Sequence, residues 1–222
     1  MNKNLWVIVN FKSNLDINKT LDWVSVVGPK LYKREDLKIV VCPDFLSIEE
    51  VKKQMLVNNF PILVGSQDLS PFPEGSYTGE EAAKFLSPFI DLAILGHSER
   101  RKNFAETDEM VAQKVMEAKK YNIIPLVCVQ GENTPIPNDC NLVAYEPIFA
   151  IGTGNPDTPS NANSVATKLK TKKDNLEVLY GGSVNFENVK DFLMQENING
   201  VLVATGALNP SDFLKIISQV DA

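Results

Sequence analysis

Eight short apolar runs, separated by longer amphipathic stretches, recur along the 222 residues of this chain. Each run is almost continuously hydrophobic and lacks the every-second-residue alternation of a strand with one face in water. Such runs are typical of strands that are buried on both faces of a parallel sheet. The runs cover residues 5–9, 37–42, 62–65, 92–95, 123–129, 142–145, 176–180 and 201–204.

The stretches between the runs carry the signals of helices. Residues 108–121 place apolar side chains at helical spacing. Thr158 precedes Pro159 and Asn209 precedes Pro210, so each pair puts a capping side chain before a proline suited to the first helical position. Eight strands that alternate with helices predict an α/β fold, a (β/α)8 barrel. The alternative is a doubly wound open sheet, and we favour the barrel because no Gly-rich dinucleotide fingerprint follows any run.

One link between the predicted strands is too short for a helix. The segment from Asn133 to Val143 includes the start of the sixth strand, and Pro135 and Pro137 interrupt the rest. We therefore expect the helix after the fifth strand to be missing or reduced to a turn within residues 133–141. Part of the outer wall of the barrel would then be covered by neighbouring elements or by another subunit.

Composition limits the partners and the location of the protein. The chain is 44% hydrophobic and has no flexible linker, which predicts a single domain over residues 1–222. Its net charge of −6 argues against nucleic acid as a partner. No apolar run has the roughly 20 residues of a membrane span, and residues 1–4 lack a signal peptide's apolar core. We expect a cytoplasmic protein with reduced cysteines, Cys42, Cys128 and Cys140.

The only histidine of the chain follows the fourth apolar run, in the motif Gly96-His97-Ser98-Glu99-Arg100-Arg101. The polar residues after His97 indicate the start of a helix, and the partial positive charge of a helix start disfavours protonation of an imidazole. A neutral imidazole can donate a hydrogen bond to a carbonyl oxygen. The alternative is an ordinary hydrogen-bonded histidine without a catalytic role.

A glutamate follows the sixth run and is itself followed by a glycine-bounded apolar segment. Pro147 ends the strand directly after Glu146 and fixes where the carboxylate points. The segment after it suits a lid that closes over a ligand and excludes water, and a carboxylate under such a cover becomes more basic. The alternative is a glutamate in an ordinary loop. The predicted lid comprises Pro147, Ile148, Phe149, Ala150, Ile151, Gly152, Thr153 and Gly154.

Further polar groups and glycine turns follow other predicted strands. Asn10 and Lys12 follow the first strand, and their alternation points both to one side. Functional groups of a barrel gather at the carboxyl ends of its strands, and the loops after strands seven and eight commonly hold a phosphate. The turns at residues 180–183 and 204–206 are therefore candidates for binding an anion through backbone N–H groups. Alternatively, their glycines serve only the turn.

Five segments in order along the chain resemble motifs of the triosephosphate isomerase family. They are Asn10-Phe11-Lys12, the segment 75–80, the histidine motif 96–101, the segment 145–154 with the glutamate and the lid, and the segment 180–184. Five ordered motifs from the first strand to the last make an accidental similarity very improbable. The resemblance implies a (β/α)8 TIM barrel that interconverts dihydroxyacetone phosphate and D-glyceraldehyde 3-phosphate through an enediolate.

The resemblance also implies roles for particular residues. Glu146 would transfer the proton between neighbouring carbons, and neutral His97 would polarise the oxygens of the enediolate. Lys12, aided by Asn10 and held by Glu99, would stabilise the negative charge. The remaining implied groups are the phosphate-binding backbone at Gly152, Ser183, Ala204 and Thr205, and the apolar pair Ile151 and Leu202 that covers the base.

The resemblance implies no metal and no organic cofactor, and it implies a homodimer. The loop at residues 75–80 would insert into the partner, with Thr78 reaching toward Asn10 and Lys12 of the neighbouring subunit. A reduced relative that keeps the barrel and serves as a phosphate-binding or interaction protein is the alternative. A third possibility is a different phosphosugar isomerase on the same barrel.

The chain departs from the family pattern at several positions. Phe149 stands where the lid normally has Trp, and Ala204-Thr205 stands where the family has Gly-Gly. The remaining departures are the trailing hinge Asn155-Pro156-Asp157, the pair Gln67-Asp68 in place of Gln-Asn, and one extra residue within 128–132.

Overall fold

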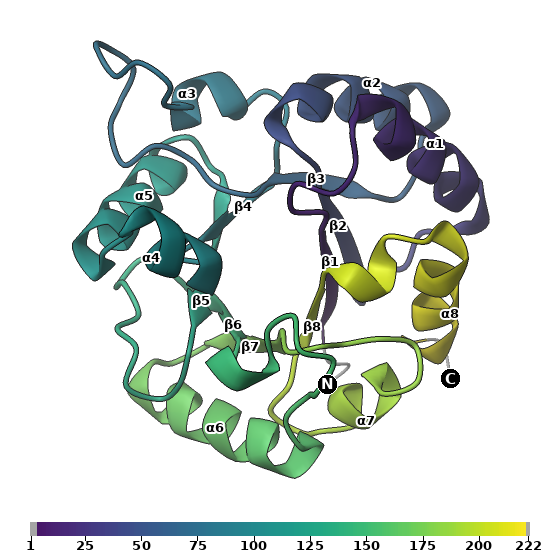
Figure 1. Ribbon diagram of the computed structural model, residues 1–222, viewed down its shortest axis with the longest axis vertical. Coiled ribbons are helices and arrows are strands. Elements are labelled where there is room, and N and C mark those ends of the chain that lie inside the picture. Colours follow the sequence, from purple (N-terminus) through teal and green to yellow (C-terminus); the bar gives the residue numbers. More distant parts are fainter. Residues whose placement is uncertain (1–3, 221–222) are drawn as a thin grey trace.

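The computed structural model describes residues 4–220, which form a closed barrel of eight parallel strands in sequence order (Figure 1). Strand β8 pairs with β1 and closes the ring. The predicted (β/α)8 barrel is thereby confirmed, and the ends of the predicted domain, residues 1–3 and 221–222, lie outside the described residues. The strands are β1 (Leu5–Asn10), β2 (Leu37–Cys42), β3 (Leu63–Ser66), β4 (Leu92–Leu95), β5 (Ile124–Val129), β6 (Leu142–Tyr145), β7 (Glu177–Tyr180) and β8 (Gly200–Val203).

Helices surround the barrel on its outside (Figure 1). At both predicted proline starts the capping side chain is in place: the Thr158 hydroxyl accepts from the Asn161 N–H at 3.2 Å, and Asn209 Oδ1 accepts from the Ser211 N–H at 2.8 Å. The α-helices are α1 (Ile17–Val27), α2 (Ile48–Asn58), α3 (Ala83–Leu86), α4 (Ser98–Phe104), α5 (Asp108–Lys120), α6 (Pro159–Lys172), α7 (Val189–Leu193) and α8 (Pro210–Val220). Single 3₁₀ turns lie at η1 (Gly28–Lys30), η2 (Phe45–Ser47), η3 (Ile148–Ala150) and η4 (Thr205–Ala207).

The strands are hydrophobic on both faces because each face packs against a separate apolar core. In β1, Trp6 and Ile8 belong to the cluster inside the barrel, and Val7 and Val9 belong to the cluster between strands and helices. Layers of side chains from different strands fill a barrel of this size, so its centre is solid. The continuous apolar runs of the sequence follow directly from these two cores.

The link from β5 to β6, residues 130–141, contains turns and no helix. The link itself covers this part of the wall, because Ile136 packs against the outer core and Cys140 is fully buried. Two lysines of the α6 region, Lys172 and Lys173, donate hydrogen bonds to carbonyl oxygens of the link. The link and the α6 region thus cover part of this wall within one chain.

Residues 4–220 hold neither a membrane-spanning helix nor a cluster of metal-ligating side chains. None of their helices is both long enough and apolar enough to span a membrane. Their His, Cys, Asp and Glu side chains form no group of three or more that would hold a metal ion. Cys42, Cys128 and Cys140 are buried and unpaired by disulfides.

Candidate active site

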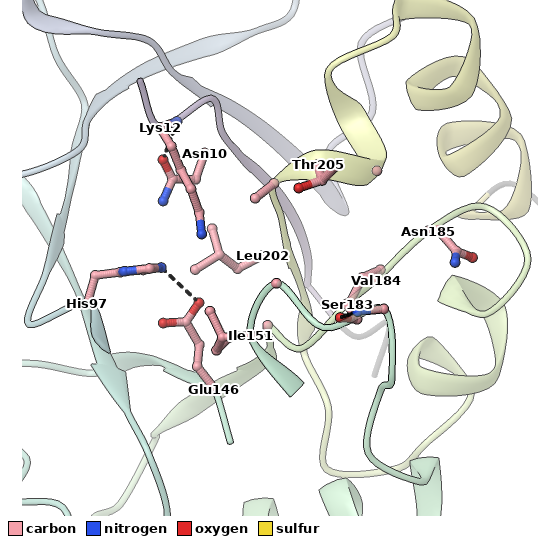
Figure 2. A pocket seen from close by; sticks show the side chains of 15 residues that line it. Asn10, Lys12, His97, Glu146, Ile151, Ser183, Val184, Asn185, Leu202 and Thr205 are labelled. Atoms are coloured by element: carbon pink, nitrogen blue, oxygen red, sulfur yellow. Dashed lines mark hydrogen bonds and ion pairs between the residues drawn. The ribbon is translucent and has the colours of Figure 1, made fainter. Parts of the chain in front are cut away.

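A cavity of about 290 Å³ opens at the carboxyl ends of the strands (Figure 2). Its wall is built from loops that follow β1, β4, β6, β7 and β8, which the closed barrel brings together although they are far apart in the sequence. The residues that line it are Asn10, Lys12, His97, Glu146, Ile151, Gly152, Gly154, Gly181, Ser183, Val184, Asn185, Leu202, Ala204, Thr205 and Gly206.

Glu146 presents a buried carboxylate to this cavity. The residue is only 2% exposed, and its backbone N–H continues the barrel by donating to the Val129 carbonyl at 2.8 Å. Its Oε1 lies 3.4 Å from His97 Nε2, and its Oε2 has no hydrogen-bond partner in the described part of the chain. A buried carboxylate oxygen without a partner is free to accept a proton from a bound ligand.

Gly181 makes the room that this carboxylate occupies. A Cβ at position 181 would lie 2.8 Å from Glu146 Cγ and 3.1 Å from its Oε1. Gly181 was predicted only as part of a phosphate-binding turn, so its contact with the glutamate was missed.

His97 caps the amino terminus of α4. Its Nδ1 accepts a hydrogen bond from the Glu99 N–H at 3.2 Å, which requires a lone pair on Nδ1 and leaves the proton of the neutral imidazole on Nε2. Nε2 points toward Glu146 across the cavity floor (Figure 2). The side chain is thus placed to donate one hydrogen bond to a ligand oxygen.

The ionisation of His97 is set by opposing effects. Burial lowers the pKa of the imidazole, and the charge and hydrogen bond of Glu146 raise it by more, so the pKa lies above its ordinary value of 6.5. The helix start alone predicted a neutral ring, and the Glu99 amide favours that form. The neighbouring Glu146 carboxylate shifts the balance toward protonation. The prediction from the helix start did not include this group. Above the raised pKa the ring carries its single proton on Nε2.

Lys12 is held in a left-handed backbone conformation, with a φ of 48°. Asn10 Oδ1 accepts from the Lys12 N–H at 2.9 Å, and Gln67 Nε2 donates to the Lys12 carbonyl oxygen at 2.7 Å. Backbone strain of this kind persists only where the surroundings impose it, and it concentrates at functional sites. The role of Gln67 was missed, because nothing local in the sequence joins it to Lys12.

The Lys12 ammonium is aimed by Glu99. Its Nζ lies 2.5 Å from Glu99 Oε1, and it points into the cavity (Figure 2). Glu99 is the one predicted catalytic residue that does not line the cavity, and it reaches the site through Lys12.

Gly152, Ser183, Ala204 and Thr205 all line the cavity, and Ser183 and Thr205 lie on the side away from His97 (Figure 2). Thr205 begins the short turn η4, and Ala204 precedes it. Gly152 and Gly154 come from the lid. The Ser183 hydroxyl bonds to the lid, donating to the Ala150 carbonyl at 2.6 Å and accepting from the Gly154 N–H at 3.1 Å.

Part of the predicted lid lines the cavity. Its 3₁₀ turn buries Ala150 completely and leaves Ile148 and Phe149 exposed. Ile151 and Leu202 both line the cavity next to Glu146 (Figure 2). Of the lid, only Ile151, Gly152 and Gly154 face the cavity; the other five predicted residues do not line it.

This arrangement suits proton transfer at a carbon next to a carbonyl group. A carboxylate with a free oxygen, an imidazole N–H and an ammonium group surround a space large enough for a small molecule. The carboxylate can take up the proton while the two donors stabilise the negative charge that develops on oxygen.

Comparisons with known proteins agree with this geometry. A family model described as triosephosphate isomerase matches residues 5–220. A triosephosphate isomerase of Mesomycoplasma hyopneumoniae (strain 232) is 33% identical over 95% of this chain and 97% of its own. Proteins of the same name from Aquifex aeolicus (strain VF5) and Mesomycoplasma hyorhinis are 31% and 36% identical, over 95% and 96% of this chain and 97% of each relative.

Proposed function

This chain belongs to the triosephosphate isomerase family, and we propose that Glu146 and His97 carry out its isomerisation of dihydroxyacetone phosphate and D-glyceraldehyde 3-phosphate. The observation that carries the proposal is the 3.4 Å approach of His97 Nε2 to Glu146 Oε1 inside the cavity that Lys12 also lines. The reaction belongs to glycolysis and gluconeogenesis.

Glu146 is the base of the proposed mechanism. Its partnerless oxygen removes a proton from the carbon beside the substrate carbonyl and returns it to the neighbouring carbon. The two oxygens of the enediolate then share the negative charge. His97 donates its Nε2 proton in hydrogen bonds to these oxygens, and the bond from the Glu99 amide to Nδ1 supports the neutral tautomer that does so.

Lys12 supplies positive charge to a chain whose net charge is −6. Its ammonium group is proposed to contact the substrate where the enediolate and the phosphate meet. Glu99 bonds to this ammonium group, and Asn10 holds the backbone of Lys12. The backbone at Gly152, Ser183, Ala204 and Thr205 lines the cavity, and it is proposed to cradle the phosphate.

Closure of the lid excludes water from the reacting atoms. Exclusion strengthens the electrostatic interactions inside the cavity. It also protects the enediolate, which otherwise eliminates its phosphate.

The experiment that tests this function is a coupled isomerase assay on the purified protein and on E146Q, H97A and the double variant. We expect each single variant to lose about 10² to 10⁴-fold in kcat/KM, as is typical when a general acid or base is removed. The matched control E35Q changes an exposed glutamate and should retain wild-type activity. Wild-type turnover no greater than that of the double variant would refute the proposal.

The alternative of a phosphate-binding relative without activity is not favoured by the family comparison. Phosphorus NMR titrations with inorganic phosphate and with an enediolate analogue separate the two functions, because only an enzyme prefers the analogue.

We further propose a homodimer formed around residues 75–80. The loop is exposed throughout, and Tyr77 within it stacks on Phe72 with ring centroids 4.4 Å apart, so a rigid aromatic pair is offered to a partner. Leu46, on the turn η2, is likewise exposed, at 86%. Thr78 would reach toward Asn10 and Lys12 of the neighbouring subunit. Light scattering tests the dimer, and a stable, fully active monomer would contradict it.

We also propose that the protein works in the cytoplasm, because its reaction belongs to glycolysis. Fractionation of the source cells tests this location.

A further inference from the structure

Asp157 ends the trailing hinge of the lid and carries a buried carboxylate that the mechanism above does not use. The residue is only 9% exposed. A carboxylate is rarely buried unless hydrogen bonds or charges satisfy it, so its partners indicate what it does.

The carboxylate accepts three hydrogen bonds. Oδ2 accepts from Tyr145 Oη at 3.1 Å and from Asn161 Nδ2 at 2.7 Å, and Oδ1 accepts from the Thr158 N–H at 2.7 Å. The backbone N–H of Asp157 donates to Tyr180 Oη at 2.7 Å. Asp157 thereby joins the start of α6 to the ends of two strands.

The two tyrosines lie directly beside the groups that position the base. Tyr145 is the last residue of β6 and precedes Glu146, and Tyr180 is the last residue of β7 and precedes Gly181. Both ends of the lid therefore meet at one place: its leading end follows Tyr145 along the chain, and its trailing end is bonded to Tyr145 through Asp157.

Both phenols are held in the protonated form that this arrangement needs. Burial, and after it the charge of Asp157, raises the pKa of Tyr145 well above its ordinary value. Burial is also the main cause that raises the pKa of Tyr180, to about 12. At neutral pH Tyr145 therefore keeps the proton that it donates to Asp157.

We propose that Asp157 is a positioning residue of the isomerase: its carboxylate, through Tyr145, fixes the trailing hinge so that the lid closes in register over Glu146. This inference rests on the proposed function. Within residues 147–157, Asp157 is the residue whose side chain bonds to Tyr145.

A loosened hinge has a specific chemical consequence. When the lid opens before the proton is returned, a lone pair on an enediolate oxygen forms a new C=O bond. The electron pair of the enediolate C=C bond then forms a new C=C bond to the phosphate-bearing carbon, and the C–O pair leaves with the phosphate. Inorganic phosphate leaves, and the remaining enol takes up a proton to give methylglyoxal. The share of turnovers that end in elimination therefore measures lid closure, which general destabilisation of the fold does not change.

The experiment compares D157A, D157N, Y145F and the double variant D157A/Y145F. For each variant we measure kcat, KM, methylglyoxal formed per isomerisation, and the urea midpoint of unfolding. The matched control D174N changes an exposed aspartate beyond the end of α6. Wild-type turnover in the same assay tests the proposed function separately, because the elimination share is defined only where turnover occurs.

We expect D157A to lose about tenfold or more in kcat, since small misplacements of reacting groups have effects of that size, while KM changes less. Its elimination share should rise several-fold. D157N keeps one acceptor oxygen, so its kcat and its elimination share should lie between those of D157A and wild type. The double variant should be no worse than D157A, because D157A already removes the one hydrogen bond that Y145F breaks.

Either of two results would overturn the proposal. One is a D157A protein that has the kcat and elimination share of wild type. The other is a double variant whose losses are the product of those of D157A and Y145F. Should D157A not fold, the same readouts on D157N and Y145F decide, and wild-type values in both would refute the inference.

Discussion

The substitution G181A tests how closely the barrel places the base. A Cβ at position 181 would lie 2.8 Å from Glu146 Cγ. Carbon atoms in favourable contact are about 3.5 to 4.0 Å apart, so the glutamate must withdraw by roughly 0.7 Å or more. A displacement near 1 Å of a reacting group costs about 10²-fold in rate. We therefore expect kcat/KM to fall by about 30- to 100-fold.

The assay is the coupled isomerase reaction with G181A and the control G131A. Gly131 also follows a strand, and a Cβ built there meets no atom within 4 Å in the described part of the chain. We expect G131A to keep its activity. If G181A unfolds like wild type and its kcat/KM stays within threefold of wild type, the close packing of Gly181 on the base has no catalytic meaning.

Three further predictions concern charge and stability. The pKa of His97, followed by NMR on the only imidazole of the chain, should lie above 6.5 and fall in E146Q; an unchanged value would contradict the coupling. The interaction of protonated His97 with Glu146 therefore adds to the free energy of unfolding in full below pH 6.5. This contribution is lost as pH rises through the raised pKa of His97, and it should vanish in E146Q. K114M should lower the free energy of unfolding by about 3–5 kcal/mol in urea, because Lys114 is buried between Asp68 and Glu106; less than 1 kcal/mol would refute this.

The strands and most of the active site could be predicted because their signals are local. A strand packed on both faces is apolar throughout, and a barrel brings the carboxyl ends of its strands to one rim, so the positions of His97 and Glu146 followed from two short segments. The prolines within residues 130–141 and the shortness of this link likewise indicated a connection without a helix.

Contacts between distant segments could not be predicted in this way. Gln67 holds the backbone of Lys12 from 55 residues away. Asp157 was recognised only as part of an unusual hinge, because its bonds to Tyr145 and Tyr180 depend on the register of two strands. The raised pKa of His97 has the same origin, since its cause is a carboxylate on another strand and not its own helix.

Conversion of dihydroxyacetone phosphate in deuterium oxide tests the central claim most directly, which is that one carboxylate removes and returns the proton. Wild type is expected to form glyceraldehyde 3-phosphate that keeps part of the transferred protium, with less than one deuteron per molecule at carbon 2, and E146Q to form almost none of this product. Rapid turnover by E146Q with the deuterium content of wild type would contradict the account.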